Sequence, residues 1–392
     1  MKSGKHNRLA RRAAAIAGLA LLAIQADVPA NAGPREQAKR IHDRLAGVPP
    51  SDAVLTQMAN DIAGGQTDAA AQLAMANPNF YNVTLKNFVA PWTNRDRSVF
   101  VPLNDYTATV IGMVRDDVDF STLLSADLLY VANTAGAPAY SPANNNHYQY
   151  LDDNNVDLQA ALKPATQSGL LGLPVAATAG IITTHAAAQA FFINGTNRAM
   201  FRFTMINHMC RDMEQLQDSS LPPDRIRQDV SRSPGGDSRV FLNSCITCHA
   251  GMDPQAQAFA YYNFDATSGQ LQYTAGVVQP KYLINSDNFK SGYVTVDDHW
   301  NNRYRQGANQ VLGYDASLPG SGSGAKSFGQ ELAHSDGFAQ CQVEKVFRAV
   351  CLRDPGNAAD RQAVSTIKSK FKTTGYKMKQ VFADAAVYCM GN

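Results

Sequence analysis

Cys245-Ile246-Thr247-Cys248-His249 is the stretch of this 392-residue chain on which the prediction of its fold rests. Two thiols three positions apart, followed at once by an imidazole, have the spacing of a covalent c-type haem attachment site. In such a site each thiol adds to one vinyl group of the porphyrin, and the adjacent histidine becomes the proximal ligand of the iron. The sequence therefore predicts one covalently bound haem c, held by Cys245 and Cys248 and ligated by His249.

Two other readings of the same stretch are a zinc site and a redox dithiol. Structural zinc sites usually need a second Cys or His pair at similar spacing, and the sequence has none. A redox dithiol does not need His249, and the flanking sequence lacks the strand-then-helix pattern of a thioredoxin-like unit. Both readings are weaker than haem attachment.

The N-terminus has the pattern of a secretory signal peptide. Five basic residues precede an apolar run over 13–24, and Ala30-Asn31-Ala32 is a small-x-small cleavage site. We therefore expect residues 1–32 to be a signal peptide and the mature chain to be periplasmic or secreted in a bacterium. Cleavage would remove five basic residues and Asp27, so the net charge of +2 would become about −2.

The composition of the mature chain excludes two classes of partner. No basic stripe remains to bind nucleic acid. No later apolar stretch is long enough to span a bilayer, so no membrane span is expected after cleavage. The predicted partner is a redox protein.

The expected fold is mainly α and has three parts after the signal peptide. Residues 33–218 are expected to form a helical domain. Within it, apolar residues recur at helical spacing over 120–131. Residues 219–325 form a cytochrome c-like haem-binding domain with a long loop insertion. Residues 326–392 form a C-terminal helical subdomain, a hairpin whose helices carry apolar faces over 343–351 and 378–389.

Four cysteines remain for disulfide bonds in an oxidising compartment. Cys351 and Cys389 lie on the apolar faces of the two hairpin helices, so we pair them. Cys210 is then left for Cys341.

Several residues could surround the haem. The proline of Met252-Asp253-Pro254 cannot donate a backbone hydrogen bond, and a carbonyl near it could accept one from the proximal imidazole. An aromatic run follows and could form an apolar wall that excludes water, although an aromatic core is the alternative. The predicted cofactor-binding residues beyond the motif are Pro254, Phe259, Tyr261, Tyr262 and Phe264.

The sixth iron ligand has three candidates in the sequence. His299 lies in the loop insertion and could fold over the haem, while Met205 and His208 lie on a helix that could pack across it. An open or water-bound position is a fourth possibility.

The chain resembles the planctomycete-type cytochrome c domain proteins, a family of exported bacterial haem proteins. The resemblance rests on the Cys-x-x-Cys-His motif, on Met252-Asp253-Pro254 and on Asn263-Phe264-Asp265, with weaker similarity over 120–131, 197–210 and 328–341. The chain departs from the family at Gln255-Ala256-Gln257 and over 266–269. The resemblance implies a c-type haem protein and does not supply a reaction.

The predicted function is single-electron transfer by an exported monohaem cytochrome c. Two alternatives stay open. One is a peroxidase-like haem-dependent oxidoreductase with an open iron position, and the other is a haem-bearing binding subunit of a larger redox complex.

Overall fold

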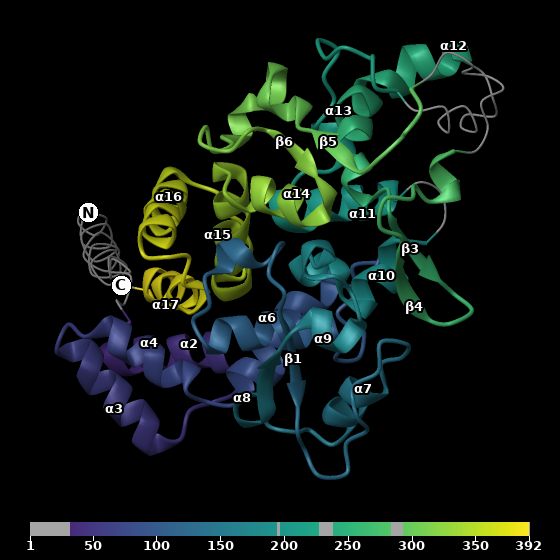
Figure 1. Cartoon of the computed structure of the whole chain (residues 1–392). Helices are drawn as coiled ribbons and strands as arrows, with labels where there is room; N and C mark the ends of the chain where they lie inside the picture. Colours follow the sequence, from purple (N-terminus) through teal and green to yellow (C-terminus); the bar gives the residue numbers. More distant parts are fainter. Residues whose placement is uncertain (1–31, 194–196, 227–237, 284–292, 392) are drawn as a thin grey trace, which may run out of the picture.

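The computed structural model describes residues 32–193, 197–226, 238–283 and 293–391, and it is mainly helical (Figure 1). The predicted signal peptide lies outside the described residues, apart from Ala32. Within the described part of the chain, no helix is both long enough and apolar enough to cross a membrane. The fold class predicted from the sequence is confirmed.

The α-helices of the described residues follow one another along the chain, and the first and the last of them lie side by side (Figure 1). Their bounds are α2 Pro34–Ala46, α3 Asp52–Ala63, α4 Thr67–Met75, α5 Lys86–Val89, α6 Asp105–Arg115, α7 Asn146–Asp153, α8 Leu158–Ala161, α9 Gln167–Leu171, α10 His185–Phe191, α11 Arg198–Thr204, α12 Ser238–Val240, α13 Ile246–Ala256, α14 Gly324–Ala333, α15 Asp336–Cys351, α16 Ala358–Thr373 and α17 Met378–Tyr388.

Local sequence signals explain where the first helices begin and end. Pro34 occupies the first turn of α2, where its missing N–H has no intrahelical partner to lose. Gly47 ends that helix with a φ of 72°, a conformation that glycine adopts without steric cost. The Ser51 side chain accepts a hydrogen bond from the Val54 N–H and caps α3.

The described strands form three small antiparallel sheets of two strands each. They pair β1 Leu129–Ala132 with β2 Leu162–Ala165, β3 Tyr262–Asp265 with β4 Gln270–Tyr273, and β5 His299–Asn301 with β6 Ser321–Ser323. The helix that apolar spacing predicts over 120–131 is therefore wrong: Phe120–Thr122 is a 3₁₀ turn and Leu129–Ala132 is strand β1. A short apolar run fits a helix or a strand equally well, and here pairing with β2 satisfies the backbone. The long insertion likewise contains strands and 3₁₀ turns.

The C-terminal part contains more than the predicted hairpin. Helices α15 and α17 do pack together, but α16 lies between them in sequence and contacts both. The two disulfides are the predicted ones, Cys210–Cys341 and Cys351–Cys389. The first joins the end of the α11 segment to α15, and the second joins α15 to the end of α17.

One hydrophobic core runs through all three predicted segments. Buried residues of α2–α6, of the segment around α13 and of α14–α17 belong to the same cluster. The ring pairs Phe120–Phe338 and Phe259–Phe328 show such packing between distant parts of the sequence. The hydrophobic core is therefore continuous across the predicted boundaries near residues 218 and 325.

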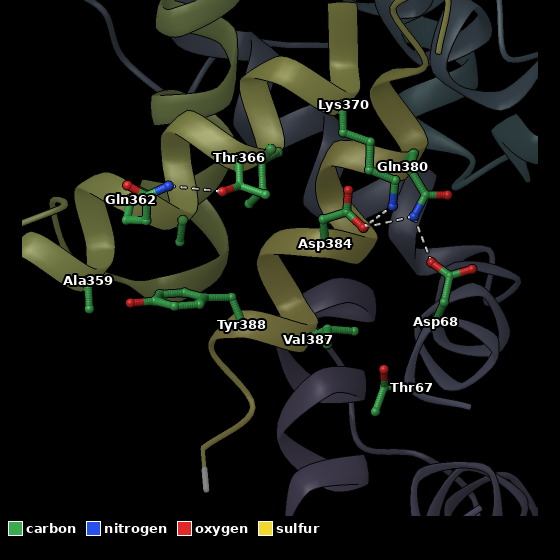
Figure 2. A pocket seen from close by; sticks show the side chains of 12 residues that line it. Thr67, Asp68, Ala359, Gln362, Thr366, Lys370, Gln380, Asp384, Val387 and Tyr388 are labelled. Atoms are coloured by element: carbon green, nitrogen blue, oxygen red, sulfur yellow. Dashed lines mark hydrogen bonds and ion pairs between the residues drawn. The ribbon is translucent and has the colours of Figure 1, made fainter. Parts of the chain in front are cut away.

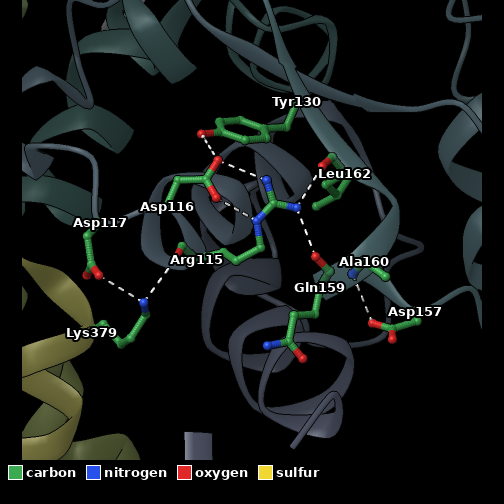
Figure 3. Close-up of polar contacts among 9 residues, drawn as sticks. All are labelled: Arg115, Asp116, Asp117, Tyr130, Asp157, Gln159, Ala160, Leu162 and Lys379. Atoms are coloured by element: carbon green, nitrogen blue, oxygen red, sulfur yellow. Dashed lines mark hydrogen bonds and ion pairs between the residues drawn. The ribbon is translucent and has the colours of Figure 1, made fainter. Parts of the chain in front are cut away.

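An arginine at the end of α6 ties that helix to the first sheet (Figure 3). Arg115 makes a two-point ion pair with Asp116, at 2.7 and 2.8 Å, and donates to the backbone carbonyls of Gln159 at 3.0 Å and Leu162 at 2.6 Å. The Tyr130 hydroxyl donates to the same Asp116 carboxylate at 2.8 Å. This network stabilises the scaffold and lies away from α13 (Figure 1).

A surface cleft of about 720 Å³ lies between α16, α17 and the start of α4 (Figure 2). Its rim is polar, because Gln380 donates to both Asp68 and Asp384, and Lys370 forms an ion pair with Asp384 at 2.7 Å. None of the haem-motif residues lines this cleft.

Candidate functional site: the Cys-x-x-Cys-His helix

The five motif residues occupy one continuous helical segment. A π-helical turn, Phe241–Cys245, leads directly into α13, so that Cys245 is the N-cap residue and the next four positions begin the helix. Turns of this kind are frequent at functional sites. Residues spaced by three and four positions share a helix face, so one face of the segment carries Cys245, Cys248 and His249.

Both motif thiols are half-buried and neither is in a disulfide, whereas the other four cysteines are paired. The Cys248 thiol donates to the Met213 carbonyl at 3.5 Å, and burial raises its pKa. The described residues contain no group of three or more His, Cys, Asp or Glu side chains that could hold a metal ion.

A buried carboxylate orients the predicted proximal histidine. His249 and Asp253 are four residues apart on α13, and the His249 Nδ1 atom lies 3.0 Å from Asp253 Oδ1. The Asp253 side chain is completely buried, while 16 % of the His249 side chain remains exposed. A hydrogen bond at Nδ1 fixes the ring and leaves Nε2 as the ligating nitrogen.

Helix α11 brings a cation to the same carboxylate. Arg198 Nε lies 3.8 Å from Asp253 Oδ1, which places a positive charge beside the buried negative one. The neighbouring Asn197 is also fully buried, and its amide donates to the carbonyls of Phe259 at 2.8 Å and Tyr262 at 2.9 Å. These contacts fix α11 against the haem-motif segment.

The acceptor for the proximal imidazole differs in kind from the predicted one. The sequence suggests a backbone carbonyl near Pro254, but the partner of Nδ1 is the carboxylate of Asp253. Pro254 itself is buried inside α13, where it cannot donate the usual hydrogen bond to the carbonyl four residues earlier. Its assignment as a haem-binding residue stays a prediction.

Gly251, three positions after Cys248 on α13, packs closely on a tyrosine. A Cβ atom at Gly251 would lie 2.2 Å from Cε1 of Tyr304, so only glycine allows this approach. The Tyr304 ring is fully buried, and within the described part of the chain its hydroxyl has no hydrogen-bond partner. Burial raises its pKa well above the ordinary value. This orphaned polar atom lies against the helix that carries the motif.

The predicted aromatic wall makes core contacts. Phe259 packs edge-on against Phe192, and Tyr262 stacks on Phe192 and donates its hydroxyl to the Ala177 carbonyl at 2.6 Å. Phe264 lies edge-on to His185. Tyr261 belongs to a small separate cluster with Tyr282, Ala260 and Tyr273. These contacts favour the alternative reading, an aromatic core.

A ring that does lie beside His249 is Phe241, with its centroid 5.2 Å from that of the imidazole. Phe241 is buried and belongs to the π-helical turn before Cys245. The sequence analysis did not select it, nor Asp253, Arg198 or Tyr304. The i, i+4 spacing of His249 and Asp253 was a usable signal, whereas the approach of Arg198 and Tyr304 depends on tertiary packing.

The three candidates for the sixth ligand lie in different surroundings. Met205 and His208 are buried, and His208 Nε2 lies 3.0 Å from the Tyr106 hydroxyl. Burial and the nearby Lys345 lower the His208 pKa well below its usual value. His299 is exposed at the start of β5, and β5 packs against α13. Of the three candidates, His299 is therefore the one that is exposed to solvent on a strand beside the motif helix. Its role as an iron ligand stays a prediction.

The residues present fit a covalently attached haem. Both thiols are partly exposed, lie outside the disulfides and share a helix face with the imidazole. The imidazole is already oriented by a buried acceptor. Comparison with known proteins found no match to a family model, a curated protein or a solved structure.

Proposed function

We propose that this chain is an exported monohaem c-type cytochrome that exchanges single electrons with a partner protein. The observation that carries the proposal is the shared face of Cys245, Cys248 and His249 on one helix, with both thiols outside the disulfides. The paired Cys210–Cys341 and Cys351–Cys389 are compatible with export to the periplasm or the medium.

In this proposal each residue has a narrow role. Cys245 and Cys248 bind the porphyrin, His249 ligates the iron through Nε2, and Asp253 holds the imidazole in that orientation. A bound haem supplies reversible one-electron chemistry at its iron. Phe241 covers one side of the imidazole and limits the access of water to it.

Acid–acetone extraction of protein exported from cells with a haem-attachment system tests the proposal. Colour should remain with the protein, and Cys245→Ala with Cys248→Ala should lose it. His249→Ala should abolish the normal haem spectrum, while His334→Ala, at a half-buried histidine bonded to the Gln330 carbonyl, should leave it unchanged. Colour in the organic layer from the wild-type protein would contradict covalent attachment.

A second candidate function is favoured by the carboxylate at Nδ1. A carboxylate partner makes the imidazole a stronger electron donor than a backbone carbonyl does, and such a donor favours oxidative chemistry at an open iron position. Visible spectra with and without cyanide or carbon monoxide separate the two functions. A six-coordinate low-spin iron that resists these ligands favours electron transfer, and rapid binding favours a peroxidase-like oxidoreductase.

A further inference from the structure

A second cleft lies on the other side of the core and shares no residue with the haem motif. It has a volume of about 380 Å³ and runs along α10, beneath the segment over 93–104 and the start of α7. This volume is in the range of sites that take small organic molecules.

A buried histidine without a partner lines the cleft. Only 6 % of His185 is exposed, and its ring nitrogens have no hydrogen-bond partner among the residues that the structure describes. An imidazole nitrogen that has no protein partner can exchange hydrogen bonds with water or with a ligand. The imidazole is therefore available to a molecule in the cleft.

Hydrogen bonds to the Asp105 carboxylate fix the backbone at His185. Its backbone N–H donates to Asp105 Oδ2 at 2.6 Å, and the Ala186 N–H donates to Asp105 Oδ1 at 3.0 Å. The imidazole also lies edge-on to Phe264, with 6.0 Å between ring centroids. A ring held in this way is preorganised to bind and loses little conformational freedom on doing so.

A guanidinium stands at the other end of the cleft. Arg95 donates from Nε to the Ala190 carbonyl at 2.7 Å and from Nη2 to the Ile193 carbonyl at 3.3 Å. These bonds hold the side chain at the C-terminal end of α10, and its Nη1 group has no partner within the described part of the chain. Positions 185 and 190 are separated by about 8 Å along a helix axis.

Apolar side chains lie between these ends, beside the uncharged polar residues Thr93, Asn94, Asn104, Asn145 and Gln189, and no acidic side chain lines the cleft. Ala186 and Ala190 form part of the floor, and Val101 and Pro102 lie on the opposite wall. A guanidinium at one end, an imidazole at the other and apolar side chains between them suit a ligand with a carboxylate and a hydroxyl at opposite ends of an apolar body.

We propose that this cleft binds a small hydroxycarboxylic acid, with its carboxylate on Arg95 and its hydroxyl on His185. A second carboxylate at the His185 end would face the buried Asp105 carboxylate, which disfavours dicarboxylates. The site would serve the chain as a binding site for an organic acid, and it does not depend on the haem proposal.

Titration of the full mature chain with 4-hydroxybenzoate tests this assignment, with the imidazole signals of labelled histidines followed by NMR. The signal lost in His185→Gln should shift saturably. Arg95→Gln should weaken binding by about tenfold or more, because a charge-assisted hydrogen bond is lost. Arg97→Gln, the same change at an exposed arginine of the same loop that does not line the cleft, should leave the affinity unchanged.

A second variant separates the loss of a binding group from local disorder caused by Arg95→Gln. Ala190→Leu keeps both polar ends and fills the floor, so it should also lose binding while its thermal unfolding stays cooperative. The absence of a saturable shift would overturn the proposal. Equal affinities of Arg95→Gln and Arg97→Gln, or equal binding of 4-hydroxybenzamide or glucose, would overturn it as well.

Discussion

Replacement of the carboxylate behind His249, the proposed proximal ligand, should raise the reduction potential of the proposed haem protein. In Asp253→Asn the amide oxygen can still accept from His249 Nδ1, whose distance to Asp253 Oδ1 is 3.0 Å. The orientation of the ring is then kept and the negative charge is lost. A buried negative charge stabilises the more positive ferric state, so its removal favours the ferrous state.

The size of this effect follows from the hydrogen bond. A hydrogen bond to a charged group contributes about 1.5–3 kcal/mol and one between neutral groups about 0.5–1.5 kcal/mol, a difference of about 1–1.5 kcal/mol. For a one-electron couple, 59 mV corresponds to a tenfold change, so the rise is at most about 40–65 mV, the value reached when the whole difference applies to the ferric state alone. Arg198, 3.8 Å from the same oxygen, offsets part of the charge and favours the lower value.

Spectroelectrochemical titration of the purified protein measures the potential directly. Asp265→Asn is the matched control, because Asp265 accepts hydrogen bonds from Thr267 and Ser268 in its own turn. Its potential should stay close to that of the wild-type protein. A fall in potential for Asp253→Asn, or a change equal to that of the control, would refute the role assigned to Asp253.

Three further predictions concern the scaffold. Gly251→Ala should destabilise the fold by about 1–3 kcal/mol, since the added methyl group overlaps the Tyr304 ring, and urea unfolding measures this. Arg115→Ala should lower the free energy of unfolding by about 2–3 kcal/mol in the same assay, because two backbone carbonyls lose their donor. The control is Arg361→Ala, at an exposed side chain with one such bond, and it should lower the free energy of unfolding much less. Burial lowers the pKa of Lys281 from 10.5 to about 7, so between these values the folded state binds fewer protons than the unfolded chain and stability should rise with pH. Lys281→Met should remove that rise in unfolding experiments at pH 7 to 10.

The helices and disulfides were predictable because their signals are local or follow from a shared face. Ser51 caps its helix through its own hydroxyl, as the sequence indicates. Cys351 and Cys389 were paired correctly because both lie on apolar faces of helices that must pack together. Strand β1 was missed, since four apolar residues carry no period that separates strand from helix.

The surroundings of the motif were less predictable. Phe259 and Tyr262 have the composition expected of a haem wall, but aromatic residues have the same composition in a core, and their contacts here are with the core. The ion pair of Arg198 with Asp253 and the packing of Tyr304 on Gly251 join segments far apart in sequence. The spacing of residues within one stretch of sequence does not indicate contacts of this kind.

Intact mass spectrometry of the exported protein tests the central claim most directly. The account predicts a mature chain whose mass exceeds that of the polypeptide by one haem, with peptide mapping that places the added mass on the fragment containing Cys245 and Cys248. The protein should be produced in cells that attach haem to other cytochromes. A polypeptide mass without haem, with these two cysteines free or joined to each other, would then contradict the account.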